Sequence, residues 1–158
     1  MRKTNTLILA AILISIITSC GKGEAYFEFE KVEKGEWHRD TVLVFNVDSL
    51  TVNPLLKYDI QLDIVYTSLY PYHDLWMMVT NNIIDSIFLS DTIQTSLIDD
   101  YGKRTGSGNL GLYQLSVPYK TNIKLDTITP YTVSVGHAMR DRKLKGIEKI
   151  GLKIYESE

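Results

Sequence analysis

The amino-acid sequence predicts an all-β protein, a single antiparallel β-sandwich, jelly-roll-like, of roughly ten short strands. Apolar and polar residues alternate with a period of two through much of the chain after residue 24, which is typical of strands with one face in water. Turn-forming residues separate these runs, and a helical period is almost absent. The 158 residues contain no internal repeat and no inter-domain linker, which favours one domain.

The strands can be placed along the chain from these patterns. The most regular run, residues 58–64, puts Tyr58, Ile60, Leu62 and Ile64 on one face. The same alternation recurs at residues 113–117, 131–135 and 150–154. Runs rich in β-branched and aromatic residues add predicted strands at residues 26–32, 41–47, 75–80, 83–89, 92–98 and 122–126.

The connections between these runs carry turn-forming residues. Asn81 and Asn82 suit a two-residue hairpin, and Gly102 suits the left-handed position of a longer loop. We therefore expect neighbouring strands to be antiparallel. The only helix expected is a turn or two near residues 138–145. The prolines fall at the edges of runs, where a missing amide hydrogen does no harm: Pro54, Pro71, Pro118 and Pro130.

The first residues have the layout of a bacterial lipoprotein signal. Arg2 and Lys3 precede an apolar stretch at residues 7–17 that is broken only by Ser15. A membrane-spanning helix needs about 20 apolar residues, so a permanent transmembrane anchor is the weaker alternative. The segment ITSCG at residues 17–21 then places small residues directly before a cysteine, which is the pattern of a lipobox.

Cys20 is the single cysteine of the chain and the expected site of lipid attachment. An internal disulfide is excluded, which leaves a bond to another molecule, or a cysteine without a role, as the alternatives. A thiolate is nucleophilic enough to take a diacylglycerol group, and two acyl chains hold a protein stably on a membrane. We predict a signal peptide at residues 1–19, a lipidated tether at 20–24 and the β-sandwich domain at 25–158.

Charge argues against a nucleic-acid partner and against electrostatic attachment to a membrane. The 17 Lys+Arg and 19 Asp+Glu give a net charge of −2, whereas a nucleic-acid binder needs clustered excess basic charge. Loss of residues 1–19 removes two basic residues and no acidic one, which brings the net charge to −4. We therefore expect the acyl chains, and not the protein surface, to hold the domain on the membrane.

Catalytic and metal-binding patterns are not expected in this chain. His38 with Asp40, and His73 with Asp74, place an imidazole near a carboxylate, but adjacent residues on a strand point to opposite faces. We therefore expect neither pair to form a catalytic dyad. The three histidines, the last being His137, are far apart in sequence and lack the close spacing of zinc ligands. We expect no metal, no cofactor and no enzymatic activity.

Two segments offer residue types that bind partners well. Tyr70, Tyr72 and Trp76 would supply aromatic surface that stacks on sugar rings or anchors a protein partner, unless they belong to the core. Arg140 begins a basic segment that would face lipopolysaccharide phosphates or an acidic partner, unless it is a solvated loop. The sequence does not show whether these two segments meet.

An ordered set of motifs resembles the gliding-motility-associated lipoprotein GldH family of Bacteroidota. The motifs span nearly the whole mature chain, and the lipobox fits as well. They are Trp37, Asp40 and Phe45; residues 70–76; Gly102, Lys103, Gly106 and Gly108; residues 137–140; and Leu144, Gly146, Ile147 and residues 150–152. The resemblance implies a non-enzymatic envelope lipoprotein linked with gliding motility and with the type IX secretion machinery. It assigns one functional residue, Cys20.

The leading interpretation is an accessory or structural lipoprotein of the cell envelope that acts by protein-protein contact. The alternative is a carbohydrate- or peptidoglycan-binding module, because sandwiches often carry glycans. Exported surface lipoproteins of Bacteroidota tend to have several acidic residues after the cysteine. Here only Glu24 follows closely, beside Lys22, so we expect anchoring in the outer membrane on the periplasmic side.

Overall fold

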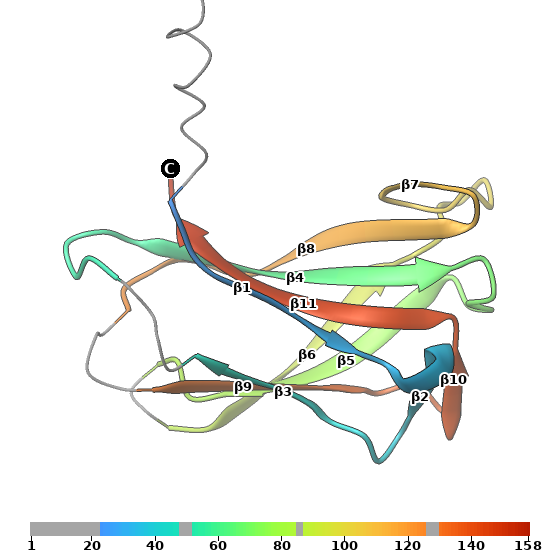
Figure 1. Ribbon diagram of the computed structural model, residues 1–158, viewed down its shortest axis with the longest axis horizontal. Helices are drawn as coiled ribbons and strands as arrows, with labels where there is room; N and C mark the ends of the chain where they lie inside the picture. Colours follow the sequence, from blue (N-terminus) through green and yellow to red (C-terminus); the bar gives the residue numbers. More distant parts are fainter. Residues whose placement is uncertain (1–22, 48–51, 85–86, 126–129) are drawn as a thin grey trace, which may run out of the picture.

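The computed structural model describes residues 23–47, 52–84, 87–125 and 130–158, and eleven strands lie within them (Figure 1). The predicted signal peptide, Cys20 and most of the predicted tether lie outside these residues. No helix in the described part of the chain is long and apolar enough to cross a membrane.

The strands form two main sheets and a short ribbon. The five-stranded sheet has the order β1 (Glu24–Lys31), β11 (Ile147–Glu156), β4 (Tyr58–Thr67), β8 (Leu112–Ile123) and β7 (Ser107–Asn109). The four-stranded sheet has the order β3 (Leu43–Val47), β9 (Tyr131–His137), β5 (Asp74–Asn81) and β6 (Leu89–Ser96). The ribbon pairs β10 (Lys143–Lys145) with β2 (Glu36–His38), and one 3₁₀ turn, η1 (Glu33–Gly35), precedes β2.

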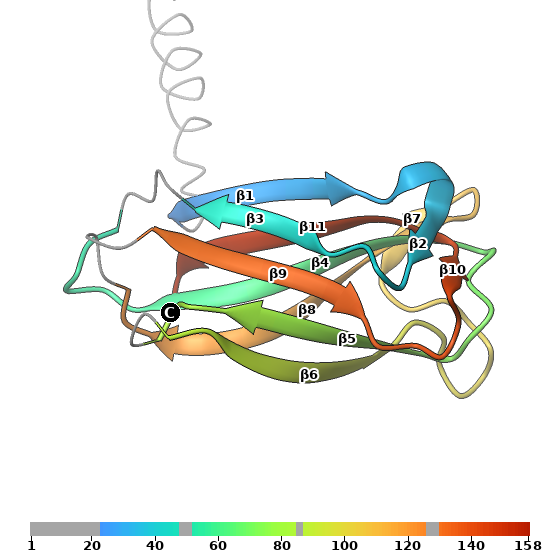
Figure 2. The ribbon, with the colours of Figure 1, turned by 90° about the horizontal axis from the view of Figure 1, so that it is seen from below.

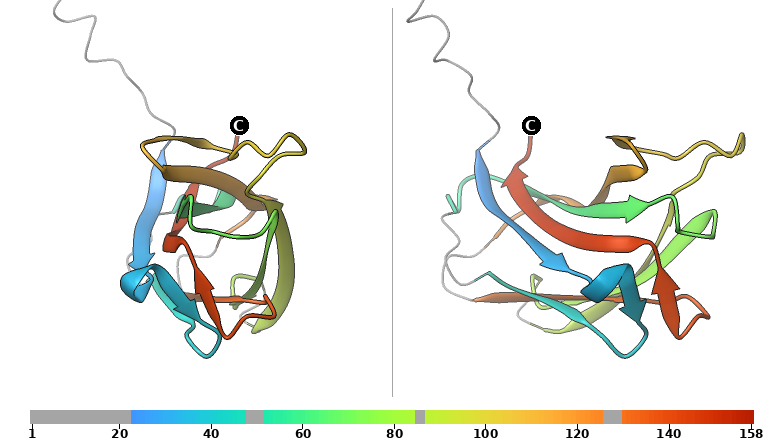
Figure 3. Two further views of the ribbon diagram at one scale, coloured as in Figure 1. Left: turned by 90° about the vertical axis from the view of Figure 1, so that its right-hand side faces the viewer. Right: turned by 45° about the vertical axis from the view of Figure 1, so that its right-hand side comes forward.

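The two sheets pack face to face, and all pairs of neighbouring strands are antiparallel (Figures 2 and 3). The order β1-β11-β4-β8 facing β3-β9-β5-β6 is that of a jelly roll, in which the chain passes repeatedly from one sheet to the other. The predicted all-β antiparallel sandwich is therefore confirmed.

The alternating pattern places the core where the sequence predicted it. Tyr58, Ile60, Leu62 and Ile64 of β4 are each at most 1% exposed, and they face the four-stranded sheet. Alternate residues of β3, β5 and β9 close the core from the other side: Leu43, Phe45, Val47, Leu75, Met77, Val79, Tyr131, Val133 and Val135. A period of two thus determined which face of each strand is buried.

The predicted two-residue hairpin at Asn81 and Asn82 is wrong, although β5 and β6 do pair antiparallel. Asn81 and Leu89 are register partners, so the connection is longer and residues 83 and 84 lie in a turn, not in a strand. The amide side chains explain the difference: Asn81 Oδ1 accepts from Ile83 N–H at 3.2 Å, and Asn82 Oδ1 accepts from Thr132 N–H at 2.7 Å. These side-chain hydrogen bonds compete with the backbone hydrogen bonds between β5 and β6, so the pairing ends at Asn81.

The predicted strand 113–117 and the first two residues of the predicted strand 122–126 belong to the single strand β8, whereas residues 124 and 125 lie outside any strand and residue 126 lies outside the described residues. The prediction that Pro118 lies at the edge of a strand is therefore wrong, because Pro118 lies inside β8. Two features accommodate it: the register with β4 shifts between Ile60 and Gln61, and β7 pairs with β8 only at Leu112–Gln114. A bulge at an unpaired strand edge is where a proline can be tolerated.

The predicted helical turn at residues 138–145 is wrong. Residues 138–142 are irregular, and β10 follows, with Leu144 as the register partner of Trp37. Both side chains are at most 1% exposed, so burial of Leu144 against the core determines the extended conformation.

The strand register separates two ends of the sandwich. At the end that we call the tether end, the start of β1 at Glu24 lies beside the end of β11, and the start of β4 pairs with the ends of β11 and β8. The opposite end, called the distal end, holds the loop before β5 and the segment after β9 (Figure 1). The tether and these loops therefore lie at opposite ends of the long axis.

Candidate functional site

Three of the four residues predicted as a partner surface line one pocket at the distal end. Tyr72 comes from the loop before β5, Trp76 from the start of β5 and Arg140 from the segment after β9. Residues 138, 139 and 141 complete the lining of the pocket, whose volume is about 500 Å³. We call this pocket the distal groove. The structure thus brings together two segments that lie more than sixty residues apart in the sequence.

Tyr70 is the exception, and the prediction that it contributes surface is corrected. Its side chain is 0% exposed, its hydroxyl donates to the Asp74 carbonyl at 2.7 Å, and burial raises its pKa. Its ring lies 6.0 Å from that of Tyr72 in an edge-to-face arrangement. Tyr70 therefore supports the groove from the core and does not face a partner.

Hydrogen bonds join the two segments that form the groove. The Tyr72 hydroxyl donates to Asp141 Oδ2 at 2.7 Å, and this bond is the main cause that raises the pKa of Tyr72. Ala138 N–H donates to the Trp76 carbonyl at 2.8 Å, and Trp76 N–H points to Met139 Sδ at 3.4 Å. These hydrogen bonds hold the two segments that form the groove against each other.

Arg39 holds the segment after β9, which forms one wall of the groove. Its guanidinium donates to the Met139 carbonyl at 3.1 Å and also to the Arg140 carbonyl. Arg140 itself is exposed and forms no ion pair among the described residues. Its guanidinium is therefore available to an incoming group.

The distal groove combines apolar and polar binding groups. Trp76 is 41% exposed and Tyr72 is 38% exposed, so part of each side chain is open to solvent and the rest packs against the protein. Arg140 and Asp141 add one charge of each sign. Anchored aromatic side chains beside an arginine are typical of the central residues of protein interfaces, and the same groups also suit a sugar ring.

Beside the groove, His73 and Asp74 interact directly, contrary to expectation. His73 Nδ1 lies 2.7 Å from Asp74 Oδ1, because His73 precedes β5 and is not held in the strand's alternation. Asp74 also accepts from Ser96 Oγ at 2.7 Å and from Gln94 Nε2 at 2.8 Å, and these hydrogen bonds, that of Ser96 first, lower its pKa. The carboxylate is therefore fully engaged in local structure.

His137 is a buried titratable group behind the groove that the sequence did not single out as such. It is 5% exposed, its ring stacks edge-to-face on Trp37, and its Nε2 lies 3.1 Å from the Trp37 carbonyl. Its Nδ1 is buried without a hydrogen-bond partner in the described structure. Burial lowers the pKa of His137, because a second ring proton would find no acceptor.

We expect the stability of the domain to fall as the pH drops below about 6.5, the ordinary value for histidine. The unfolded chain binds the His137 proton more readily than the folded chain, so acidification favours unfolding by up to about 1.4 kcal/mol per pH unit. Urea unfolding at pH 7.5 and 5.5 measures this, with His137→Phe as comparison. An unchanged pH dependence in the variant would contradict the assignment.

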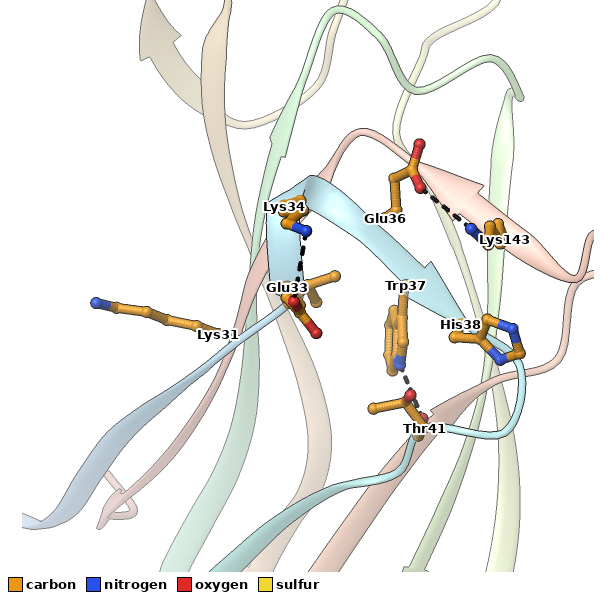
Figure 4. A pocket seen from close by; sticks show the side chains of 9 residues that line it. Lys31, Glu33, Lys34, Glu36, Trp37, His38, Thr41 and Lys143 are labelled. Carbon is orange, nitrogen blue, oxygen red and sulfur yellow. Dashed lines mark hydrogen bonds and ion pairs between the residues drawn. The ribbon is translucent and has the colours of Figure 1, made fainter.

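A second pocket, of about 320 Å³, lies over Trp37 between the end of β1 and the ribbon (Figure 4). Its floor is fixed by Trp37 Nε1, which donates to the Thr41 carbonyl at 3.0 Å. Its rim carries charges of both signs, and Glu36 lies 3.8 Å from Lys143 and 3.9 Å from Lys145. The basic segment predicted after Arg140 is therefore partly neutralised by Glu36.

Comparison with known proteins gives consistent matches along the chain. A family model described as GldH lipoprotein matches residues 24–154. A protein of Christiangramia forsetii called gliding motility lipoprotein GldH homolog is 27% identical over 165 residues, which cover 100% of this chain and 99% of that protein. The gliding motility lipoprotein GldH of Flavobacterium johnsoniae is 24% identical over the same shares of both chains.

Among solved structures, the infectious bursal disease virus Gx strain gives a TM-score of 0.28 at 12% identity. The match covers 84% of this chain and 29% of that chain. A similarity at this level says nothing about function.

Proposed function

The chain belongs to the GldH lipoprotein family, and from this premise we propose that it is a lipid-anchored accessory protein of the gliding-motility machinery that acts by protein-protein contact. The full-length similarity to two gliding motility lipoproteins supports the assignment to this machinery. The proposal includes attachment through Cys20, location in the outer membrane on the periplasmic side, and a link with type IX secretion.

The single observation that carries the contact model is the position of the distal groove relative to the tether. Cys20 lies four residues before the start of β1, so the lipid holds the tether end close to the membrane. The ten residues of β4 run from that end to the other and span about 30 Å at about 3.3 Å per residue. The groove therefore faces away from the membrane, where a protein partner can reach it.

Replacing Tyr72 or Arg140 by alanine is expected to weaken association with the partner by about 1 to 4 kcal/mol while the fold stays intact. Both side chains are exposed, so their loss leaves no cavity in the core. A photo-cross-linking residue at the neighbouring Ala138 in native membranes would capture the partner, and mass spectrometry would identify it. The yield is then compared between wild type and the two variants.

Tyr101→Ala is the matched control, because Tyr101 is a 96% exposed aromatic residue of the chain that does not line the distal groove. We expect it to leave the cross-link unchanged. If Tyr72→Ala and Arg140→Ala also leave the yield unchanged while the melting temperature falls, these residues belong to the scaffold and the groove is not the contact site.

A glycan is the alternative ligand, favoured by the two half-exposed aromatic rings beside Arg140 and Asp141. Co-sedimentation with purified peptidoglycan tests it directly. Retention that is lost in Trp76→Ala, together with no protein cross-link from Ala138, would replace the contact model by a carbohydrate-binding one.

A further inference from the structure

The outer face of the four-stranded sheet is almost free of charge. Among the outward positions of β3, β9, β5 and β6, all of which the structure describes, Asp74 is the one charged residue, and its partners are Ser96, Gln94 and His73. The outer face of the five-stranded sheet differs, because it carries six charged residues: Glu24, Lys31, Asp59, Asp63, Lys149 and Lys153.

Large apolar side chains stand on this uncharged face. Val42 is 52% exposed, Val44 is 42% exposed and Met78 is 50% exposed, and Trp76 continues the series toward the distal groove. The neighbouring outward positions hold glycine or hydroxyl side chains, such as Gly136 and Ser134. Depletion of charge combined with exposed methionine and tryptophan is characteristic of interface cores.

Large and small residues are arranged on this face in a complementary way. In the register of β5 with β9, Met78 is the partner of Gly136 and Thr80 is the partner of Ser134. Beyond the ladder, Trp76 lies beside Ala138. In each of these pairs β5 carries the larger side chain, and β9 leaves a depression beside it.

We propose that this face binds a second copy of the chain, with a two-fold axis parallel to the strands between β5 and β9. Rotation about that axis places β5 of one copy over β9 of the other at the same height. Met78 then lies over the Gly136 of the other copy and Thr80 over its Ser134, twice by symmetry. Because the face carries almost no charge, self-association brings few like charges together.

The dimensions of the face match those of a dimer interface. Four strands about 4.8 Å apart and up to eight residues of about 3.3 Å each give a plane of about 500 Å². Because side chains project from this plane, the accessible area of the face is larger than about 500 Å². It is therefore closer to the roughly 800 Å² per partner that specific interfaces bury.

The orientation is also compatible with a common membrane, and this step rests on the proposed lipid anchor. A two-fold axis along the strands keeps both tether ends on the same side. Two anchored copies can therefore pair while standing side by side, with Tyr72 and Arg140 of each still at the distal end.

Thiol cross-linking of the lipidated protein in native membranes tests the pairing. Ser134→Cys places a thiol on β9 next to the axis, and a short bis-maleimide spans the distance of about 10 Å between packed sheets. We expect a cross-linked dimer from Ser134→Cys and none from Gln114→Cys, which lies on the outer face of the other sheet. A cross-linked dimer from Gln114→Cys and none from Ser134→Cys would overturn the proposal. A cross-link of Ser134→Cys to a different protein would also overturn it.

A charge placed in the interface separates pairing from accidental collision. In the Ser134→Cys background, Met78→Lys is expected to reduce the dimer about tenfold or more, because the lysine would be buried without a partner. Leu112→Lys is the matched control, since Leu112 is 49% exposed and Met78 is 50% exposed, on opposite outer faces. An equal yield in the two lysine variants would contradict the proposal.

Cross-linking of the protein without an introduced cysteine tests the proposed lipid anchor separately from the proposed pairing. If Cys20 carries lipid, no thiol remains and no cross-link forms. A cross-link in that sample would show a free Cys20 and would contradict the anchor, whereas the dependence of the Ser134→Cys dimer on Met78 would still decide the pairing. Sedimentation of the detergent-solubilised protein gives the mass independently, and a monomer at high concentration would exclude the dimer.

Discussion

Gly146→Ala is expected to destabilise the domain by about 2 to 5 kcal/mol. Gly146 has φ +85°, which costs an L-residue with a side chain about 1 to 2 kcal/mol. An added Cβ would also lie 2.3 Å from Tyr70 N and 2.7 Å from Tyr70 Cα, and such overpacking typically costs about 1 to 3 kcal/mol more. These are backbone atoms, so no side-chain rotation relieves the clash.

The position of Gly146 in the hydrogen-bond network adds to this effect. Its N–H donates to the Gly35 carbonyl at 2.9 Å, and its carbonyl accepts from Thr67 N–H at 2.8 Å. A displaced Gly146 would therefore disturb η1, the end of β4 and Tyr70 together. Because Tyr70 lies beneath Tyr72, we expect the distal groove to change as well.

Urea unfolding of the domain measures the effect, with Gly102→Ala as the matched control. Gly102 has a similar φ of +79°, but no heavy atom lies within 4 Å of the position of its added Cβ. The control is therefore expected to lose only about 1 to 2 kcal/mol. Equal losses in the two variants would show that the contact with Tyr70 contributes nothing.

Cys20→Ser is expected to abolish stable attachment of the mature protein to the membrane. Each buried methylene contributes about 0.8 kcal/mol, so loss of two acyl chains removes almost all of the binding free energy. The protein surface does not replace it, because the mature chain is acidic. Fractionation of cells that express the wild type and the variant measures the change.

The N-terminal mass of the wild-type protein decides the interpretation. An unprocessed Cys20→Ser chain stays at the membrane through residues 7–17, so fractionation has to be combined with mass spectrometry. We expect Cys20 to be the first residue and to carry acyl chains. An unmodified Cys20 in the wild type would exclude the lipoprotein assignment for this chain.

The residues that carry the family resemblance belong mostly to the scaffold. Trp37, Phe45, Tyr70, Leu144 and Ile147 are each at most 1% exposed. Together they determine how η1, the ribbon and the loop before β5 pack. The resemblance therefore identified the fold more directly than it identified a binding surface.

The sequence by itself determined the fold class and the inner face of each regular strand. These features are local, because the alternation in β4 or β9 specifies which side chains face the core whatever lies opposite. The same local rules failed where a side chain replaced a ladder bond, as Asn82 does, or where burial of Leu144 overrode a helical tendency. In both places a contact distant in sequence outweighed local preference.

Only the tertiary structure decided which candidate residues form a site. Tyr70 and Tyr72 are two residues apart and of the same type, yet the loop before β5 buries one ring and exposes the other. Arg140 meets Trp76 because β9 pairs with β5 in one register. The nearly uncharged outer face likewise depends on strand order, since it brings β3 and β9 beside β5 and β6, although these strands are not all consecutive in the chain. Juxtaposition of this kind arises from long-range packing, which a periodic pattern in one segment does not encode.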